Sequence, residues 1–161
     1  MRERLFKSIY LLWDAVIEVL TGMRTDNNHS HRTVLVVEDE RLMRRLLERI
    51  LSTDNTSVLL AADGREAVDI YRDHKWEISV VLLDLGLPKI SGWEVFNNLK
   101  QQNPDVCVVV ASGYMEPDVK RRMHEAGVEH FIEKPYKLDE LLSTLEFVIE
   151  HGCRQSLSSR S

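Results

Sequence analysis

The chain has 161 residues, of which 43% are apolar and 29% are charged, and its formal net charge is −5. This length suits one domain whose core is large enough to fold unaided, with room for a short appendage. Two cysteines exclude a disulfide framework or a thiol-rich zinc site and favour a reducing, cytoplasmic compartment. The negative balance argues against a surface that binds nucleic acid directly by neutralising phosphates. No apolar stretch reaches the roughly 18 residues that a membrane span requires.

The charge is unevenly distributed along the chain. Residues 1–31 carry four basic and four acidic side chains, whereas residues 32–151 carry 15 basic and 22 acidic ones. The acidic middle block therefore reads as the domain proper. We predict a helix in residues 1–20, a polar linker over 21–31, the domain over 32–151 and a flexible tail over 152–161.

The first block has apolar residues at three- and four-residue steps, which predicts one amphipathic helix from about Arg4 to Leu20. Asp14 and Glu18 interrupt its apolar run, which argues against a signal peptide. We expect its apolar stripe to pack on the domain or on a second copy of the chain. The linker holds two histidines, for which we expect no bound metal.

The middle block alternates apolar strands with amphipathic helices. Strands are predicted at 33–37, 58–61, 79–83, 106–110 and 129–132. Helices are predicted at 41–51, 63–74, 91–101, 117–126 and 138–150. Strands made almost wholly of Val, Ile and Leu are typical of parallel sheets covered on both faces. We therefore predict an α/β fold with a doubly wound five-stranded parallel sheet, whose functional site lies at the carboxyl ends of the strands.

Charged and polar residues follow four of these strands. They are Glu38, Asp39 and Glu40 after the first strand, Asp84 after the third, Ser112 after the fourth and Lys134 after the last. Each alone would suit a helix cap or a turn, but the set falls at one sheet edge. Crowded carboxylates repel unless a cation lies among them, and Mg²⁺ prefers oxygen ligands. A carboxylate beside Mg²⁺ and a lysine can act as a nucleophile and form an acyl phosphate.

The order and spacing of five stretches resemble a response-regulator receiver domain of two-component signalling. These stretches are VLVVEDE, AADGREAVDIY, VVLLDLGLPKISGWEVFNNLK, VVVASGY and HFIEKPYKLDELL. The resemblance covers about Arg32 to His151. It implies a flavodoxin-like, CheY-like sheet with strand order 2-1-3-4-5. It also implies a phosphoryl group received from a histidine kinase or a histidine phosphotransfer protein, with Mg²⁺ as cofactor.

The resemblance assigns the acidic residues one by one. Asp84 matches the phosphoacceptor, Asp39 matches the direct Mg²⁺ ligand, and Glu38 matches its partner, which usually acts through a water. Gly86 matches the position whose backbone carbonyl binds the metal. Glu38 stands where the family more often has Asp.

The remaining matches lie on the last two strands. Ser112 matches the switch hydroxyl, usually Thr in the family, and Lys134 matches the lysine that pairs with the phosphoryl group. Phe131 matches the aromatic switch position, and Pro135 matches a proline that is commonly cis. Tyr114 stands at a position that modulates how fast the phosphoryl group is lost.

Several functional readings follow from the resemblance. We expect no enzyme activity beyond the chain's own phosphorylation and dephosphorylation, and signalling by protein contact, since the tail is too short for a DNA-binding domain. The alternatives are a receiver module cut from a hybrid sensor kinase or, less in keeping with Gly86, a Mg²⁺-dependent phosphatase of the haloacid-dehalogenase type, which needs an acid there. A flavin-binding module would need a Ser/Thr-rich phosphate loop after the first strand. A homodimer through the N-terminal helix or through the last helix–strand–helix face is a further expectation.

Overall fold

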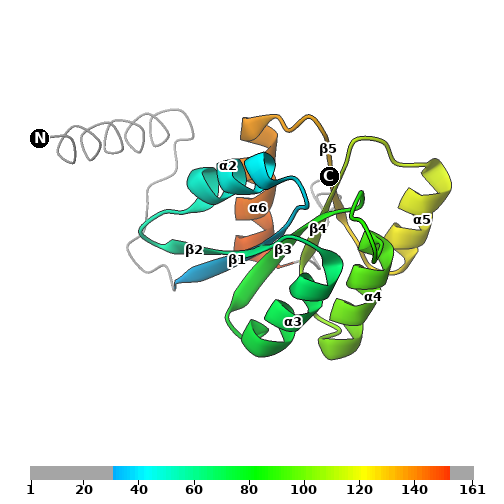
Figure 1. Ribbon diagram of the computed structural model, residues 1–161, viewed down its shortest axis with the longest axis horizontal. Helices are drawn as coiled ribbons and strands as arrows, with labels where there is room; N and C mark the ends of the chain where they lie inside the picture. Colours follow the sequence, from blue (N-terminus) through cyan, green and yellow to red (C-terminus); the bar gives the residue numbers. More distant parts are fainter. Residues whose placement is uncertain (1–30, 153–161) are drawn as a thin grey trace, which may run out of the picture. The chain divides into compact units, whose positions relative to one another are not determined.

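The computed structural model describes residues 31–152 (Figure 1). The expected N-terminal helix, and nearly all of the expected linker and tail, lie outside the described residues. The strands are β1 (Arg32–Val37), β2 (Thr56–Ala61), β3 (Ile78–Asp84), β4 (Val108–Ser112) and β5 (His130–Glu133). The helices are α2 (Arg41–Leu51), α3 (Gly64–His74), α4 (Gly92–Gln102), α5 (Pro117–Glu125) and α6 (Leu138–His151).

The strands form one parallel sheet in the order β2-β1-β3-β4-β5, which confirms the predicted doubly wound topology. Helices α2 and α6 cover one face of the sheet, and α3, α4 and α5 cover the other (Figure 1). Both faces of the sheet are therefore shielded from water, which explains the nearly continuous apolar strands.

The core consists of two apolar clusters, one on each face of the sheet. Along β1, Leu35 and Val37 point into the cluster under α3, α4 and α5, whereas Val34 and Val36 point into the cluster under α2 and α6. This alternation follows from the two-residue period of a strand. Each such buried side chain contributes roughly 1.5–3 kcal/mol, so the strand ends are held on a rigid support. Among the described residues, no helix is both long and apolar enough to cross a membrane.

The fourth strand begins two residues later than the sequence predicts. Val106 donates its backbone N–H to the carbonyl of Asn103 at 3.1 Å, and this bond closes a turn after α4. The ladder with β3 starts only at Val108, opposite Val81. Ser112 is consequently the last residue of β4 and is held by the sheet, not by the following loop.

The start of α4 fits closely against the end of β3. Ser91 and Glu94 form a capping box, in which the Ser91 hydroxyl accepts from the Glu94 N–H and the Glu94 carboxylate accepts from the Ser91 N–H. A Cβ added to Gly92 would lie 2.7 Å from the carbonyl oxygen of Asp84 and 2.8 Å from the Cα of Leu85. Glycine at this position therefore allows the helix to begin directly beside the strand end that carries Asp84.

Candidate functional site

Three carboxylates converge at the carboxyl edge of the sheet. One oxygen from each of Glu38, Asp39 and Asp84 can be chosen so that all lie within 4.8 Å of one another. Glu38 is 2% exposed and Asp84 is 6% exposed, whereas Asp39 is open to solvent. The cluster forms because β1 and β3 are neighbours in register, with Val37 opposite Leu83. The sequence predicted this convergence from the strand ends alone.

Lys134 joins two of these carboxylates from the loop after β5. Its Nζ donates to Oε2 of Glu38 and to Oδ2 of Asp84, both at 2.7 Å. Burial by itself lowers the pKa of Lys134, but the hydrogen bonds to Asp84 and Glu38 outweigh that effect and raise the pKa above its usual value. Lys134 is therefore a charged ammonium at neutral pH. The peptide bond between Lys134 and Pro135 is cis, as the resemblance implies.

Backbone groups orient the same carboxylates. Oδ1 of Asp84 accepts from the N–H of Gly86 at 2.8 Å, and Oε1 of Glu38 accepts from the N–H of Glu40 at 3.3 Å. The Arg44 guanidinium donates to the carbonyl of Glu38 at 2.6 Å and to that of Asp39. Sequence reasoning missed Arg44, because nothing local distinguishes it from the other arginines of α2.

The donor set suits a hard divalent cation. Three carboxylates and one ammonium leave a formal charge of −2, and two of the carboxylates are largely shielded from water. A cation with oxygen ligands would relieve this repulsion. Gly86 carries no side chain, so an acidic group is absent from the position that a haloacid-dehalogenase phosphatase requires.

The expected switch residues lie on β4, which pairs with β3, and on β5, which pairs with β4. The hydroxyl of Ser112 donates to the carbonyl of Tyr114 at 2.6 Å, and Ser112 itself is 8% exposed. Ser112 pairs in register with Glu133, so Lys134 follows at the same sheet edge. Phe131 is half-buried against the cluster under α3, α4 and α5, and the Nζ of Lys120 lies 5.3 Å from its ring centroid.

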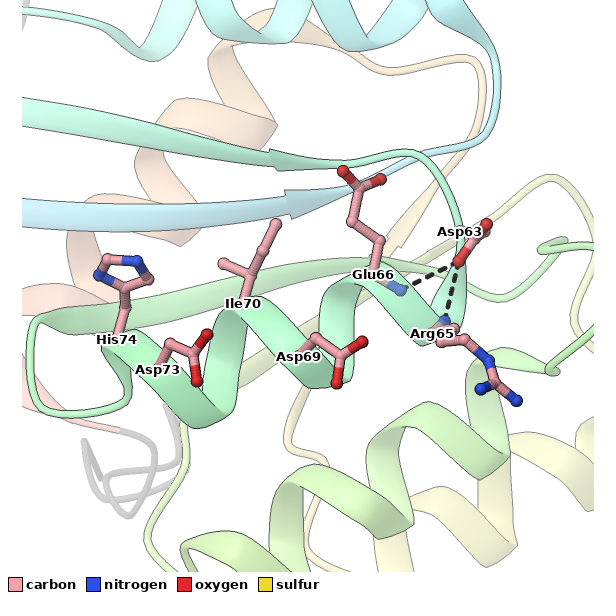
Figure 2. Close-up of a pocket in the computed structure, with 7 residues that line it drawn as sticks. All are labelled: Asp63, Arg65, Glu66, Asp69, Ile70, Asp73 and His74. Carbon is pink, nitrogen blue, oxygen red and sulfur yellow. Dashed lines mark hydrogen bonds between the residues drawn. The ribbon is translucent and has the colours of Figure 1, made fainter.

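An open depression runs along α3. Its volume is about 410 Å³. Figure 2 shows the side chains that line it, which are Asp63, Arg65, Glu66, Asp69, Ile70, Asp73 and His74. Asp63 accepts there from the N–H groups of Arg65 and Glu66 and so caps the helix. These two hydrogen bonds and Lys89 hold the pKa of Asp63 below its usual range. None of the residues that the sequence assigned to the site lines this depression.

Comparison with known proteins places the chain in a family. The family model for the response regulator receiver domain matches residues 34–146. A cyclic di-GMP phosphodiesterase from Thermotoga maritima is 35% identical over 122 residues, which are 76% of this chain and 31% of that protein. The sensor kinase CckA from Brucella abortus is 31% identical over 118 residues, which are 73% of this chain and 12% of that protein. The chain thus spans less than a third of the length of either relative.

Solved structures agree with this placement. A chain of a CheX-CheY-BeF₃-Mg²⁺ complex from Borrelia burgdorferi superposes with a TM-score of 0.67 and 27% identity, over 72% of this chain and 87% of that one. The predicted family, the sheet order and the acidic edge are all consistent with that likeness. The chain belongs to the response regulator receiver domain family of two-component signalling.

Proposed function

We propose that Asp84 accepts a phosphoryl group from a histidine kinase or a histidine phosphotransfer protein. The observation that carries this proposal is the Lys134 ammonium, which lies 2.7 Å from both Asp84 and Glu38 in a cluster of three carboxylates. A structural ion pair needs one carboxylate. The two additional acids, of which Glu38 is buried, point to a site prepared for a cation and for further negative charge.

Asp84 is the nucleophile of this proposal. One of its oxygens forms a bond to the phosphorus of a phosphohistidine, the N–P bond breaks, and the departing imidazole keeps that electron pair. The N–H of Gly86 on Oδ1 and the ammonium of Lys134 on Oδ2 hold the carboxylate in a fixed orientation. Lys134 then neutralises part of the charge on the transferred group.

Glu38, Asp39 and Asp84, with the backbone carbonyl of Gly86, would hold Mg²⁺. When bound, the cation supplies positive charge that offsets the charge of the phosphoryl oxygens. Support comes from the chemistry of the donors and from the Mg²⁺ named in the Borrelia burgdorferi complex. Arg44 fixes the carbonyls of Glu38 and Asp39 and thereby holds the turn on which both acids stand.

Signalling would follow from the movement of Ser112 and Phe131. The Ser112 hydroxyl, which now donates to the carbonyl of Tyr114, would turn to a phosphoryl oxygen, and Phe131 would move inward. The surface of α5, β5 and α6 would change and bias a two-state equilibrium that a partner protein reads. Whether that surface also makes a homodimer, and whether the chain acts alone or within a hybrid sensor kinase, stay predictions.

The test is phosphorylation by acetyl phosphate with Mg²⁺, followed by intact mass. We expect the wild-type chain to gain one phosphoryl group, and Asp84→Asn to gain none. Asp139→Asn, which changes an exposed aspartate in the first turn of α6, is the matched control and should behave as wild type. A phosphoryl group on Asp84→Asn at the wild-type level would exclude Asp84 as the acceptor.

A further inference from the structure

The ring of Tyr136 lies close to Lys134, although Tyr136 is not a member of the acidic cluster. The Nζ of Lys134 lies 5.5 Å from the centroid of the Tyr136 ring, just past the cis Lys134–Pro135 bond. The ring is half-buried and packs against the apolar cluster under α2 and α6. The Tyr136 ring is therefore anchored in the core on one side and lies near the ammonium on the other.

The neighbours of Lys134 matter because its ammonium has few N–H donors to share among them. An ammonium has three N–H donors, and within residues 31–152 two of them are used by Glu38 and Asp84. The third is left for an oxygen of the incoming phosphoryl group. An aromatic ring attracts a cation without strongly occupying an N–H group.

The charge state of the phenol agrees with this role. Burial raises the pKa of Tyr136, and the nearby carboxylates of Glu38 and Asp84 raise it further against the opposing effect of Lys134. Tyr136 is therefore neutral near pH 7 and cannot act as a counter-ion for Lys134. A hydrogen-bonding interaction between its hydroxyl and Lys134 has the smallest effect on the pKa of Tyr136, so the ring and the hydroxyl have to be tested separately.

We propose that Tyr136 is a positioning residue for phosphoryl transfer, whose aromatic ring holds the Lys134 ammonium between Asp84 and Glu38 with its third N–H directed to the phosphoryl group. The proposal rests on the function proposed above for Asp84 and Lys134. It adds a residue outside the acidic cluster to the set that determines the rate of phosphorylation.

The experiment measures the rate of phosphorylation by acetyl phosphate at saturating Mg²⁺ in ring variants. Tyr136→Phe should retain the wild-type rate, because it keeps the ring. Tyr136→Leu should lower the rate by about three- to tenfold, the range that a partly buried cation–π contact implies. Pentafluorophenylalanine at position 136 keeps the shape of the ring and reverses its electrostatic face, so it should behave like Leu. Trp76→Leu is the matched control, because the exposed Trp76 carries its own lysine contact, with Lys75 at 5.0 Å, and should leave the rate unchanged.

A packing role is separated from a positioning role by a double variant. In a Lys134→Met background, Tyr136→Leu should cause no further loss of rate, since the cation that the ring holds is gone. An additional loss there, an unchanged rate in Tyr136→Leu, or a loss in Tyr136→Phe as large as in Leu would each overturn the proposal. Thermal unfolding shows whether each variant is folded. If Tyr136→Leu does not fold, the variant with pentafluorophenylalanine at position 136 tests the proposal in its place. A wild-type chain that takes up no phosphoryl group would instead refute the proposed function.

Discussion

Lys134 and Asp84 are 50 residues apart in the chain, yet the ammonium of one lies 2.7 Å from the carboxylate of the other. This contact joins the loop after β5 to the end of β3, across the intervening strand β4. Asp84 is buried and Lys134 is one-fifth exposed, so solvent replaces little of the attraction if one partner is removed. The same ammonium also serves Glu38, and a single residue thereby holds two buried acids together.

The first prediction follows from this arrangement. Lys134→Met should destabilise the protein by about 3 kcal/mol in the absence of Mg²⁺, because it leaves two buried carboxylates unpaired. Adding Asp84→Asn to this variant should recover part of that loss, since it removes one of the unpaired charges. Unfolding in urea measures both. Lys89→Met, which breaks an exposed pair with Asp63, is the control and should change the unfolding free energy little. If the two lysine variants lose equal free energy of unfolding, the buried contact stabilises the protein no more than the exposed one.

The second prediction concerns the cation. Mg²⁺ should raise the free energy of unfolding, by about 2.7 kcal/mol at a hundred times its dissociation constant, because it binds the folded acidic cluster and not the unfolded chain. Asp39→Asn should weaken this effect, since Asp39 is the exposed member of the cluster. Asp73→Asn, in the depression along α3 (Figure 2), changes an acid outside the cluster and should respond to Mg²⁺ like wild type. Thermal unfolding across a Mg²⁺ titration checks this. If Asp39→Asn leaves the stabilisation by Mg²⁺ unchanged, the cation binds outside the acidic cluster.

The sequence alone was enough to predict the sheet and the acidic edge, since both depend on periodic patterns and on which residue follows each strand. The place of Asp84 beside Glu38 follows from parallel strands that end together. The start of β4 could not be predicted, because Val106 is as apolar as the strand itself and only its turn bond to Asn103 excludes it.

Contacts that depend on tertiary packing were also out of reach. Arg44 donates to the carbonyls of Glu38 and Asp39, which precede its helix, and the Tyr136 ring lies near the Nζ of Lys134. The sequence predicted a helix over residues 91–101, which is close to the observed α4. However, the close approach of α4 to the end of β3 is evident only from the distances around Gly92.

The third prediction tests this close approach. Gly92→Ala should destabilise the protein by about 1–3 kcal/mol, because its Cβ would meet backbone atoms of Asp84 and Leu85 that cannot move aside without shifting the strand. Phosphorylation should slow as well, since that strand end carries the acceptor. Gly113→Ala is the control for stability, because no atom lies within 4 Å of a Cβ added there. Urea unfolding of the two variants makes the comparison. A neutral effect of Gly92→Ala would mean that α4 can shift without cost.

The fourth prediction concerns His130, which is buried in β5 at 8% exposure. Its Nε2 has no hydrogen-bond partner among the described residues, and its ring packs edge-on against Phe147 with centroids 5.8 Å apart. Burial lowers the pKa of His130 below the ordinary 6.5, against a smaller opposing effect of Glu129. Folding therefore favours the neutral ring.

The sign of the pH dependence follows from that direction. Below about pH 6.5 the unfolded chain binds a proton at this histidine that the folded chain does not, so stability falls as the pH decreases from there toward the lowered pKa. Each unit of lowering corresponds to about 1.4 kcal/mol. His130→Phe keeps a ring beside Phe147 and removes the titration, so it should lose less stability than wild type between pH 7.5 and pH 5.5 in urea unfolding. His31→Gln, which changes an exposed histidine, should keep the wild-type slope. If wild type and His130→Phe lose the same free energy of unfolding over this pH range, other groups cause the pH dependence.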